Sequence, residues 1–309
     1  MTLTELRYIV AVAKELHFGR AAERCFVSQP TLSVGVRRLE DELGLLIFER
    51  GTREVSVTPL GQQVVNQARR VLEEAAAITH LAARGQDELT GALRLGVIYT
   101  IGPYLLPQLI PVLHRQAPHM PLQIEENYTA VLSERLQQGD LDVVILSLPY
   151  ARPSILVEAL YEEPFVVLLP TGHPLERETQ LTAPQLAAEE LLLLGAGHCF
   201  RDQVLQVCPE CTQLDSSTTS MQKTLEGSSL ETMRLMVASG MGVTVLPQTS
   251  VNRYPYPADL VSIRPFAEPV PRRVVALAWR RSFTRPKAVQ VLAEAIRACP
   301  LGEGVRMMP

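Results

Sequence analysis

The chain has 309 residues, of which 47% are hydrophobic, and its formal net charge at pH 7 is −4. It is too long for one compact core and too hydrophobic to be disordered, so we expect two or three folded domains. Glu5 and Arg7 interrupt the apolar core that a secretory signal needs, and no apolar run is long enough to cross a bilayer. We therefore expect a cytoplasmic protein with no membrane partner.

Charge and cysteine content exclude some classes of protein. The acidic balance gives no general support for a nucleic-acid partner, and residues 1–60 contain eight basic and eight acidic side chains. DNA binding would therefore depend on where individual residues lie. The cysteines are few, odd in number and far apart, unlike the framework of a secreted domain, so structural disulfides are not expected. They are Cys25, Cys199, Cys208, Cys211 and Cys299.

The first sixty residues predict a small helical domain with a β wing. Helical spacing predicts a first helix near residues 3–13 and a second over 19–25. Ser28 and Pro30 suit the cap and first turn of a third helix that runs to about residue 43. Residues 46–50 and 54–57 are predicted strands around a turn. The predicted buried stripe of the third helix is Leu32, Val36, Leu39 and Leu43.

A long helix is predicted from about residue 58 to 85. Its apolar or small residues alternate spacings of four and three, which is typical of a seam between paired helices. At about 1.5 Å per residue the helix is roughly 40 Å long, which favours a dimerising linker over part of a globular core. The predicted seam is Val64, Ala68, Val71, Ala75, Ile78 and Ala82.

After residue 91 the pattern changes to short apolar strands that alternate with amphipathic helices, which predicts an α/β architecture. A strand at 164–170 opens a second α/β unit, and the chain is expected to return to the first, leaving a cleft between two lobes. The predicted elements are 93–97, 104–116, 122–126, 131–138, 143–148, 164–170, 191–194, 229–239, 243–246, 273–279 and 287–298.

The polar face of the third predicted helix suits the major groove of DNA, because it carries small or hydrogen-bonding side chains opposite an apolar stripe. The candidate groove residues are Gln29, Pro30, Thr31, Ser33 and Arg37. Three further arginines, Arg38, Arg50 and Arg53, would contact phosphates or the minor groove. The alternative is a solvated polar face on a small helical domain.

Residues 6–61 resemble the winged helix-turn-helix of LysR-type regulators, notably in His17-Phe-Gly-Arg-Ala-Ala-Glu-Arg24 and Val27-Ser-Gln-Pro-Thr-Leu-Ser33. The resemblance continues through residues 39–44, 46–50 and 60–61. It implies a DNA-binding domain (1–58), a linker or dimerisation helix (59–88) and a two-lobed, periplasmic-binding-protein-like effector domain (91–309). Lobe I would span about 91–162 and 267–309, and lobe II about 163–266. The implied partners are an operator in double-stranded DNA, RNA polymerase and further copies of the chain in a homotetramer.

The segment Gly195-Ala-Gly-His-Cys-Phe-Arg-Asp-Gln203, followed by Cys208, resembles the sensing segment of the LysR-type regulators that respond to hydrogen peroxide. The resemblance assigns peroxide attack to Cys199 and disulfide resolution to Cys208. Thr100 and Thr129 stand where the peroxide oxygens would be held, and His198 and Arg201 would complete the site. It implies a regulator of antioxidant genes that needs a cellular thiol reductant, has no metal or other cofactor and is not an enzyme.

The residues themselves favour reactive thiol chemistry. Cys199 follows a glycine-rich bend beside His198 and near Arg201, all of which can lower the pKa of a thiol, especially at a helix N-terminus. Phe200, Val204 and Val207 have helical spacing, so the segment is expected to be helical when reduced. Nine residues of helix separate two Cα atoms by about 13 to 14 Å, whereas a disulfide needs them within about 7 Å. Joining Cys199 to Cys208 would therefore unwind or bend the helix.

Other interpretations of the cysteines remain open. His198, Cys199, Cys208 and Cys211 could hold zinc, although adjacent His and Cys side chains converge on one ion with difficulty. The C-x₂-C spacing also occurs in thioredoxin-like proteins, and Cys211 could compete with Cys208 as the resolving thiol. Alternatives for the whole chain are a LysR-type regulator that binds an organic metabolite in the cleft and a thiol peroxidase.

Several residues have a simpler interpretation when considered alone. Thr100 and Thr129 follow predicted strands and would usually cap helices. Cys25 and Cys299 are expected to be inert fillers of packed regions. Arg273 is expected to be a solvated surface charge.

Overall fold

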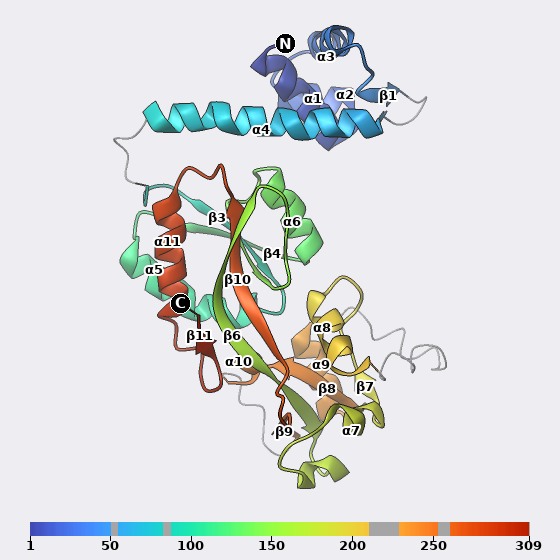
Figure 1. The fold of residues 1–309 in the computed structure, drawn as a ribbon, viewed down its shortest axis with the longest axis vertical. Helices are drawn as coiled ribbons and strands as arrows, with labels where there is room; N and C mark the ends of the chain where they lie inside the picture. Colours follow the sequence, from blue (N-terminus) through green and yellow to red (C-terminus); the bar gives the residue numbers. More distant parts are fainter. Residues whose placement is uncertain (51–54, 83–87, 210–228, 253–259, 309) are drawn as a thin grey trace. The chain divides into compact units, whose positions relative to one another are not determined.

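The computed structural model describes residues 1–50, 55–82, 88–209, 229–252 and 260–308, which form two compact units, Met1–Gln86 and Asp87–Pro309 (Figure 1). Within the described ranges, no helix combines the length and apolar character that a membrane span requires.

The N-terminal unit contains the predicted helices and wing. Its elements are α1 (Leu3–Glu15), α2 (Phe18–Arg24), α3 (Gln29–Leu43), β1 (Phe48–Arg50), β2 (Val55–Val57) and α4 (Pro59–Ala82). Polar side chains satisfy the first amides of two helices: Thr2 and Glu5 form a capping box on α1, and the Ser28 side chain accepts a hydrogen bond from the Thr31 amide on α3. The two strands of the wing pair antiparallel.

The core of this unit lies among α1, α2, α3 and the first half of α4. Three of the four residues predicted for the buried stripe of α3 are fully buried, but Leu43 is 38% exposed. Glu40 lies inside instead, and its Oε1 accepts hydrogen bonds from the Ile47 and Phe48 amides at 2.8 and 3.0 Å. The prediction for Leu43 was wrong because a buried carboxylate satisfies the backbone where the chain turns toward the wing.

Part of helix α4 packs against the core of the N-terminal unit. Val64, Ala68 and Val71 of the predicted seam pack against the N-terminal core, and Ala68 is only 3% exposed. The apolar periodicity of α4 therefore arises partly from packing within the chain and not only from a seam between two chains. Ile78, about two turns beyond Val71, is 68% exposed.

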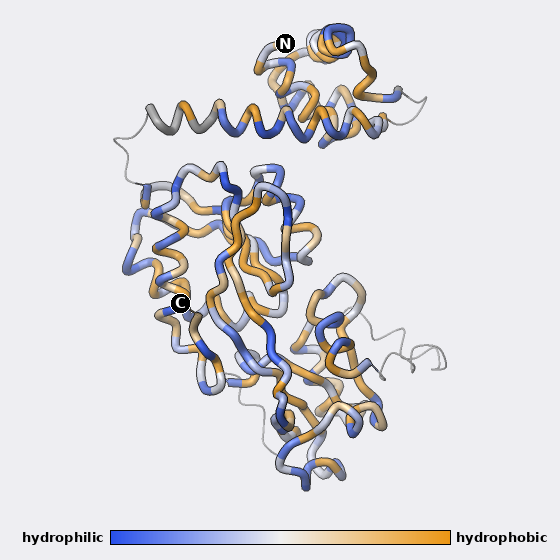
Figure 2. The backbone as a smooth tube through the Cα atoms, in the orientation of Figure 1, coloured by the Kyte–Doolittle hydropathy of each residue, from blue (hydrophilic) through white to orange (hydrophobic). Residues whose placement is uncertain are grey.

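The second unit is built on a nine-stranded sheet with the path β4-β3-β5-β10-β6-β8-β7, while β9 and β11 also pair with β6. Helices pack against this sheet, and Figure 2 shows hydrophobic colour interrupted by hydrophilic stretches along its central strands. The strands are β3 (Leu93–Ile98), β4 (Leu122–Asn127), β5 (Val143–Ser147), β6 (Ile155–Pro170), β7 (Leu191–Leu192), β8 (Val243–Pro247), β9 (Val261–Pro265), β10 (Arg272–Arg280) and β11 (Arg306–Met307). The helices are α5 (Gly102–Gln116), α6 (Thr129–Gln137), η1 (Pro174–Arg177), α7 (Ala183–Ala187), α8 (Cys199–Val207), α9 (Leu230–Ala238), α10 (Gln248–Val251) and α11 (Pro286–Arg297).

Strand β6 runs through both lobes. Its first part pairs with β10 from Ile155 to Pro164, and its second part pairs with β8 and β9 from Phe165 to Pro170. The sequence predicted only the second part as a strand and missed β9. The first part was missed because charged residues, among them Glu158, Glu162 and Glu163, interrupt its apolar pattern.

Each lobe has its own hydrophobic core, and α8 contributes to both. Cys199 packs against the core that contains β3, β5 and β10, whereas Phe200, Val204 and Val207 belong to the core around β8 and α9. The helix therefore lies where the two lobes meet, with its first residue turned toward lobe I.

Candidate functional site

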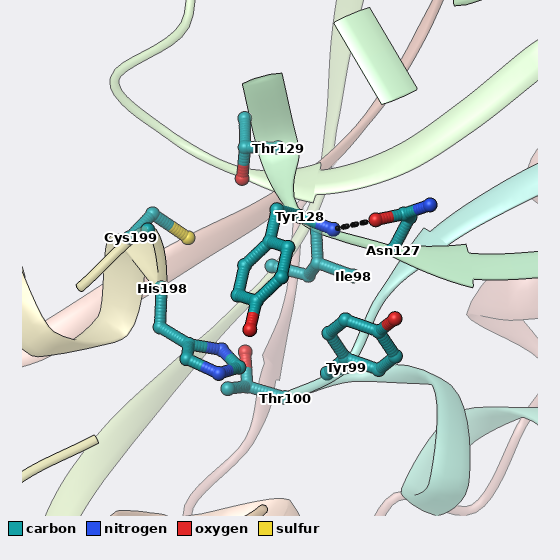
Figure 3. Close-up of a pocket in the computed structure, with 9 residues that line it drawn as sticks. Ile98, Tyr99, Thr100, Asn127, Tyr128, Thr129, His198 and Cys199 are labelled. Atoms are coloured by element: carbon teal, nitrogen blue, oxygen red, sulfur yellow. Dashed lines mark hydrogen bonds between the residues drawn. The ribbon is translucent and has the colours of Figure 1, made fainter. Parts of the chain in front are cut away.

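A small pocket forms where the end of β3, the start of α6 and the start of α8 meet. Its lining is Ile98, Tyr99, Thr100, Asn127, Tyr128, Thr129, Gly197, His198 and Cys199, and its cavity volume is about 10 Å³ (Figure 3). That volume holds roughly one water-sized molecule. Residues about 100 positions apart in the sequence thus meet around one sulfur atom.

Cys199 is a thiol and the first residue of α8. The N-cap residue His198 makes no side-chain hydrogen bond to the helix, so the side chain leaves the first amides of α8 uncapped. Burial lowers the pKa of His198, which is 7% exposed, so its neutral form is favoured and it does not act as a fixed positive charge beside the sulfur.

Two threonine hydroxyls face the same space as the Cys199 sulfur (Figure 3). Thr129 Oγ1 is buried and has no hydrogen-bond partner among the described residues. A buried hydroxyl without a partner costs free energy, and a small polar molecule in the pocket would satisfy it. Neither threonine caps a helix: Thr129 is the first residue of α6, whose N-cap is Tyr128, and Ile101 is the N-cap of α5.

A buried ion pair lies directly behind the pocket. Arg273 and Glu163 are completely buried, and the Arg273 Nε donates to Glu163 Oε1 at 2.8 Å. Arg273 also donates to Thr100 Oγ1 and to the Thr100 carbonyl oxygen, both at 2.9 Å, and its guanidinium lies 5.2 Å from the Phe200 ring centroid. Glu163 Oε2 accepts from the Thr249 amide at 2.8 Å.

The expectation that Arg273 is a solvated charge was therefore wrong. Its position, immediately before an apolar strand, resembles a strand end at the surface, but the register of β10 places it opposite Glu163 on β6. A buried arginine is stable only with its donors satisfied, and here both Thr100 and Glu163 accept from it. The signal in the sequence was weak, since Glu163 only precedes the predicted strand at 164–170.

Two other residues of the cysteine segment hold α8 in place. Arg201 does not line the pocket, and its guanidinium donates to the Leu194 carbonyl oxygen at 2.9 Å. Gln203 Nε2 donates to Ser147 Oγ at 2.9 Å and to the Leu148 carbonyl oxygen at 3.0 Å, which ties α8 to the end of β5.

Cys208 follows α8 as its C-cap residue and is disulfide-bonded. Its partner is not Cys199, because Cys25, Cys199 and Cys299 are thiols. The partner lies outside the described residues, and so does Cys211. The expectation of a chain without disulfides is not met in this state. The helical segment between Cys199 and Cys208 is present as predicted for the reduced Cys199 thiol.

The remaining cysteines lie in packed regions. Cys299 is buried in the lobe I core, and burial raises the pKa of the partly buried Cys25. Within the described residues, no group of three or more His, Cys, Asp or Glu side chains is arranged to hold a metal ion.

The candidate DNA-binding residues lie on α3 and the wing. Gln29, Pro30, Thr31, Arg37 and Arg38 are exposed, and Ser33 is half-buried. Arg38 Nε lies 3.6 Å from Glu5 Oε1, so this arginine is held against α1. Arg50 belongs to β1, and Arg53 lies outside the described residues.

Two exposed apolar residues of the N-terminal unit were not singled out from the sequence. Phe26, which precedes the cap of α3, is 94% exposed, and Val34 on α3 is 67% exposed. A protruding apolar side chain beside polar groove residues can contact thymine methyl groups.

The folds of the two units define a class of protein. A three-helix domain with a β wing, followed by a long helix and a two-lobed α/β unit, is the arrangement of a DNA-binding regulator with an effector domain. Residues 3–62 match the model of the bacterial regulatory helix-turn-helix proteins of the lysR family, and residues 86–299 match that of the LysR substrate binding domain. The chain belongs to the LysR family.

Its relatives include OxyR proteins. The chain is 40% identical over 298 residues to the DNA-binding transcriptional dual regulator OxyR of Escherichia coli K12, covering 96% of this chain and 95% of the relative. A full-length OxyR variant from Pseudomonas aeruginosa is 53% identical, with a TM-score of 0.82 and coverage of 100% and 99%. A mutant of Corynebacterium glutamicum OxyR, solved with bound H2O2, is 32% identical, with a TM-score of 0.63 and coverage of 96% and 91%. The chain is thus an OxyR-like member of the family.

Proposed function

We propose that this chain is a transcriptional activator that responds to hydrogen peroxide through oxidation of Cys199. The observation that carries the proposal is the pocket itself: a thiol at a helix N-terminus faces a cavity for one water-sized molecule, beside a buried threonine hydroxyl that lacks a partner. The likeness to OxyR proteins adds independent support.

The first chemical step is attack of the Cys199 thiolate on one oxygen of the peroxide. The S–O bond forms as the O–O bond breaks, and the second oxygen leaves as hydroxide, which takes up a proton to become water. Thr100 and Thr129 are suited to hold the two oxygens beside the sulfur. Arg273 acts through Thr100, because its two hydrogen bonds fix the position of that residue.

The second step is attack of the Cys208 thiol on the sulfenic sulfur, which releases water and forms the Cys199–Cys208 disulfide. This step requires Cys208 in its reduced form. The two residues bound α8, which keeps their Cα atoms about 13 to 14 Å apart. Closure of the new disulfide would therefore open α8 and remove Phe200 and Val204 from the lobe II core.

In this proposal the opening of α8 changes how effector domains pack and hence the spacing of the DNA-binding domains. The assembly is a homotetramer joined through residues 59–88 and the effector domains (91–309), with residues 1–58 on the operator. It acts in the cytoplasm and activates antioxidant genes with RNA polymerase. The groove-facing residues of α3 would read the bases, and the wing arginines would contact the backbone.

The two alternatives predict different measurements. A regulator that binds an organic metabolite between the lobes would keep its response when Cys199 is replaced by serine. A thiol peroxidase would turn over continuously with its reductant, whereas a sensor needs one oxidation for each switch. Steady-state peroxide consumption separates these two roles.

The proposal is tested by mapping thiols after treatment of the reduced full-length chain with stoichiometric peroxide, together with operator footprinting. We expect a peptide pair joined through Cys199 and Cys208 and a changed footprint. Cys199→Ser should abolish both. Cys25→Ser is the matched control, because Cys25 is also a reduced thiol but lies in the other unit.

The identity of the resolving thiol is tested with Cys208→Ser and Cys211→Ser. If Cys208 resolves, only the first variant loses the disulfide and accumulates a sulfenic acid at Cys199. If Cys211 competes, Cys211→Ser raises the yield of the Cys199–Cys208 product. A wild-type chain whose Cys199 and Cys208 thiols both survive peroxide would overturn the proposal.

A further inference from the structure

Three aromatic rings that take no part in the chemistry above line the pocket beside Cys199. Tyr99 follows β3, Tyr128 precedes α6, and His198 precedes α8, so each ring comes from a different segment. Their centroids lie 5.3 Å apart for Tyr99 and Tyr128, 4.7 Å for Tyr128 and His198, and 5.9 Å for Tyr99 and His198. Each pair meets edge to face or tilted, which is the favourable geometry for aromatic rings.

Tyr128 is the central member of this ring cluster. Figure 3 shows its ring between His198 on one side and Tyr99 on the other. The backbone at Gly197 runs close to the same ring, so a Cβ there would lie 3.3 Å from Tyr128 Cδ1, and the φ of +96° also favours glycine. The ring therefore has neighbours on several sides and little room to swing away.

The cavity inside this wall is small. Its volume of about 10 Å³ accommodates roughly one water-sized molecule, and hydrogen peroxide is only two oxygen atoms long. An alkyl hydroperoxide carries the same reactive O–O bond but adds carbon atoms on one oxygen. With Tyr99, Tyr128 and His198 among the lining residues, that substituent would press against these rings, and forcing extra atoms against a packed wall is unfavourable.

We propose that the ring cluster of Tyr99, Tyr128 and His198 is a size filter that admits hydrogen peroxide to Cys199 and excludes bulky alkyl hydroperoxides. The inference rests on the proposed function, since it concerns which peroxide oxidises the same thiol. With an alkyl hydroperoxide, the thiolate would attack the terminal oxygen, the S–O bond would form as the O–O bond breaks, and the alkoxide would leave and take up a proton as the alcohol.

The test compares rates of Cys199 oxidation in the reduced full-length chain by hydrogen peroxide and by tert-butyl hydroperoxide, followed by mass spectrometry after timed quenching. In the wild type we expect hydrogen peroxide to react much faster. Tyr128→Ala should raise the ratio of the tert-butyl hydroperoxide rate to the hydrogen peroxide rate by about tenfold. Because both rates come from one preparation, a fraction of misfolded protein cancels from the ratio.

Two variants separate size from other effects. Tyr128→Phe retains the ring and removes the hydroxyl, so it should keep the wild-type ratio. Tyr150→Ala shortens another tyrosine of lobe I, whose hydroxyl contacts Ser133 outside the pocket, and should also leave the ratio unchanged. Tyr99→Ala should raise the ratio less than Tyr128→Ala, because the Tyr99 ring lies farther from the His198 ring, at 5.9 Å between centroids against 4.7 Å for Tyr128.

The outcomes distinguish the two proposals. A ratio for Tyr128→Ala within twofold of the wild type would overturn the size filter while leaving peroxide sensing intact. An equal rise in Tyr128→Phe or Tyr150→Ala would also overturn it, since the hydroxyl or general loosening would then explain the result. Failure of hydrogen peroxide to oxidise wild-type Cys199 would refute the proposed function instead.

Discussion

The two helices on which the proposed function depends, α3 and α8, are built differently. Helix α3 has fifteen residues, a Ser28 side chain on its first amides and Gly44 in the left-handed conformation at its end. Helix α8 has nine residues, no side-chain cap and Cys208 at its end. Helix α3, which is proposed to present a constant surface to DNA, thus has caps at both ends. Helix α8, which is proposed to open, has no side-chain N-cap and no glycine at its C-terminus.

Helix α8 is stabilised by side-chain contacts with its surroundings and not by caps at its ends. A helix of nine residues is marginal alone in water, and a missing N-cap costs about 1 kcal/mol. Side contacts hold it instead: Phe200 packs edge to face on Phe165 at 5.1 Å between centroids, and Gln203 binds the end of β5. In the proposed mechanism, formation of the Cys199–Cys208 disulfide compensates for the loss of this packing. Helix α8 would then be stable in the reduced state and open in the oxidised state.

The largest expected effect comes from the buried ion pair that supports α8. Arg273→Met leaves the Glu163 carboxylate buried without its partner, which should lower the free energy of unfolding of the regulatory unit by about 3 to 5 kcal/mol. Urea denaturation followed by the fluorescence of Trp279, the single tryptophan, measures the loss. The double variant Arg273→Met with Glu163→Gln should recover much of it. A loss below about 1 kcal/mol would show that α8 does not depend on this pair.

A smaller change should act on the redox equilibrium. Phe200→Leu weakens packing that exists only while α8 is intact, by about 1 kcal/mol. The dithiol form loses that stability and the disulfide form does not, so the Cys199–Cys208 disulfide should become about fivefold more favourable. Titration with glutathione redox buffers measures this shift. Val166→Ala, which changes the same core outside α8, is the control, and an equal shift there would contradict the interpretation.

The cap of α3 should have a local effect of similar or smaller size. Ser28→Ala removes the acceptor for the Thr31 amide, and we expect a loss of about 1 kcal/mol in the N-terminal unit with weaker operator binding. Ser229→Ala is the matched control, because Ser229 caps α9 in the same way through the Thr232 amide. It should cost similar stability in the regulatory unit without changing operator affinity.

The smallest effect is a dependence on pH. Burial lowers the pKa of His198, so below its unfolded pKa of about 6.5 the unfolded chain binds a proton that the folded chain resists. The contribution of His198 to stability is therefore complete above that pH and declines as the pH falls. Hydrogen exchange of the α8 amides at pH 7.5 and 5.5 should show faster opening at the lower pH. In the His198→Asn variant, the difference in α8 opening between the two pH values should be smaller, because the titrating imidazole is absent.

Local patterns in the sequence predicted much of the fold. Helical spacing located α1 to α4 to within a few residues, and the alternation of strands and helices predicted the α/β unit. Cys199 was identified because an unusual string of residues surrounds it. These signals are local, since caps, turns and periodicity act over only a few residues.

Features that depend on distant residues were not predictable in the same way. The exposure of Leu43 and the burial of Glu40 follow from how the Ile47 and Phe48 amides approach α3. The spacing of apolar residues along the helix carries no information about that approach. The first part of β6 contains charges that only the register with β10 satisfies.

The class of regulator and the order of most elements could be predicted from the amino-acid sequence, and the same kind of signal made Cys199 the candidate for oxidation, because each depends on short runs of neighbouring residues. The burial of Arg273 against Glu163, and the arrangement of Tyr99, Tyr128 and His198 along one small cavity, emerge only when the chain is folded. Those arrangements arise from strand register and from the packing of segments up to about 100 residues apart, and the free energy that selects them belongs to contacts that no single segment contains.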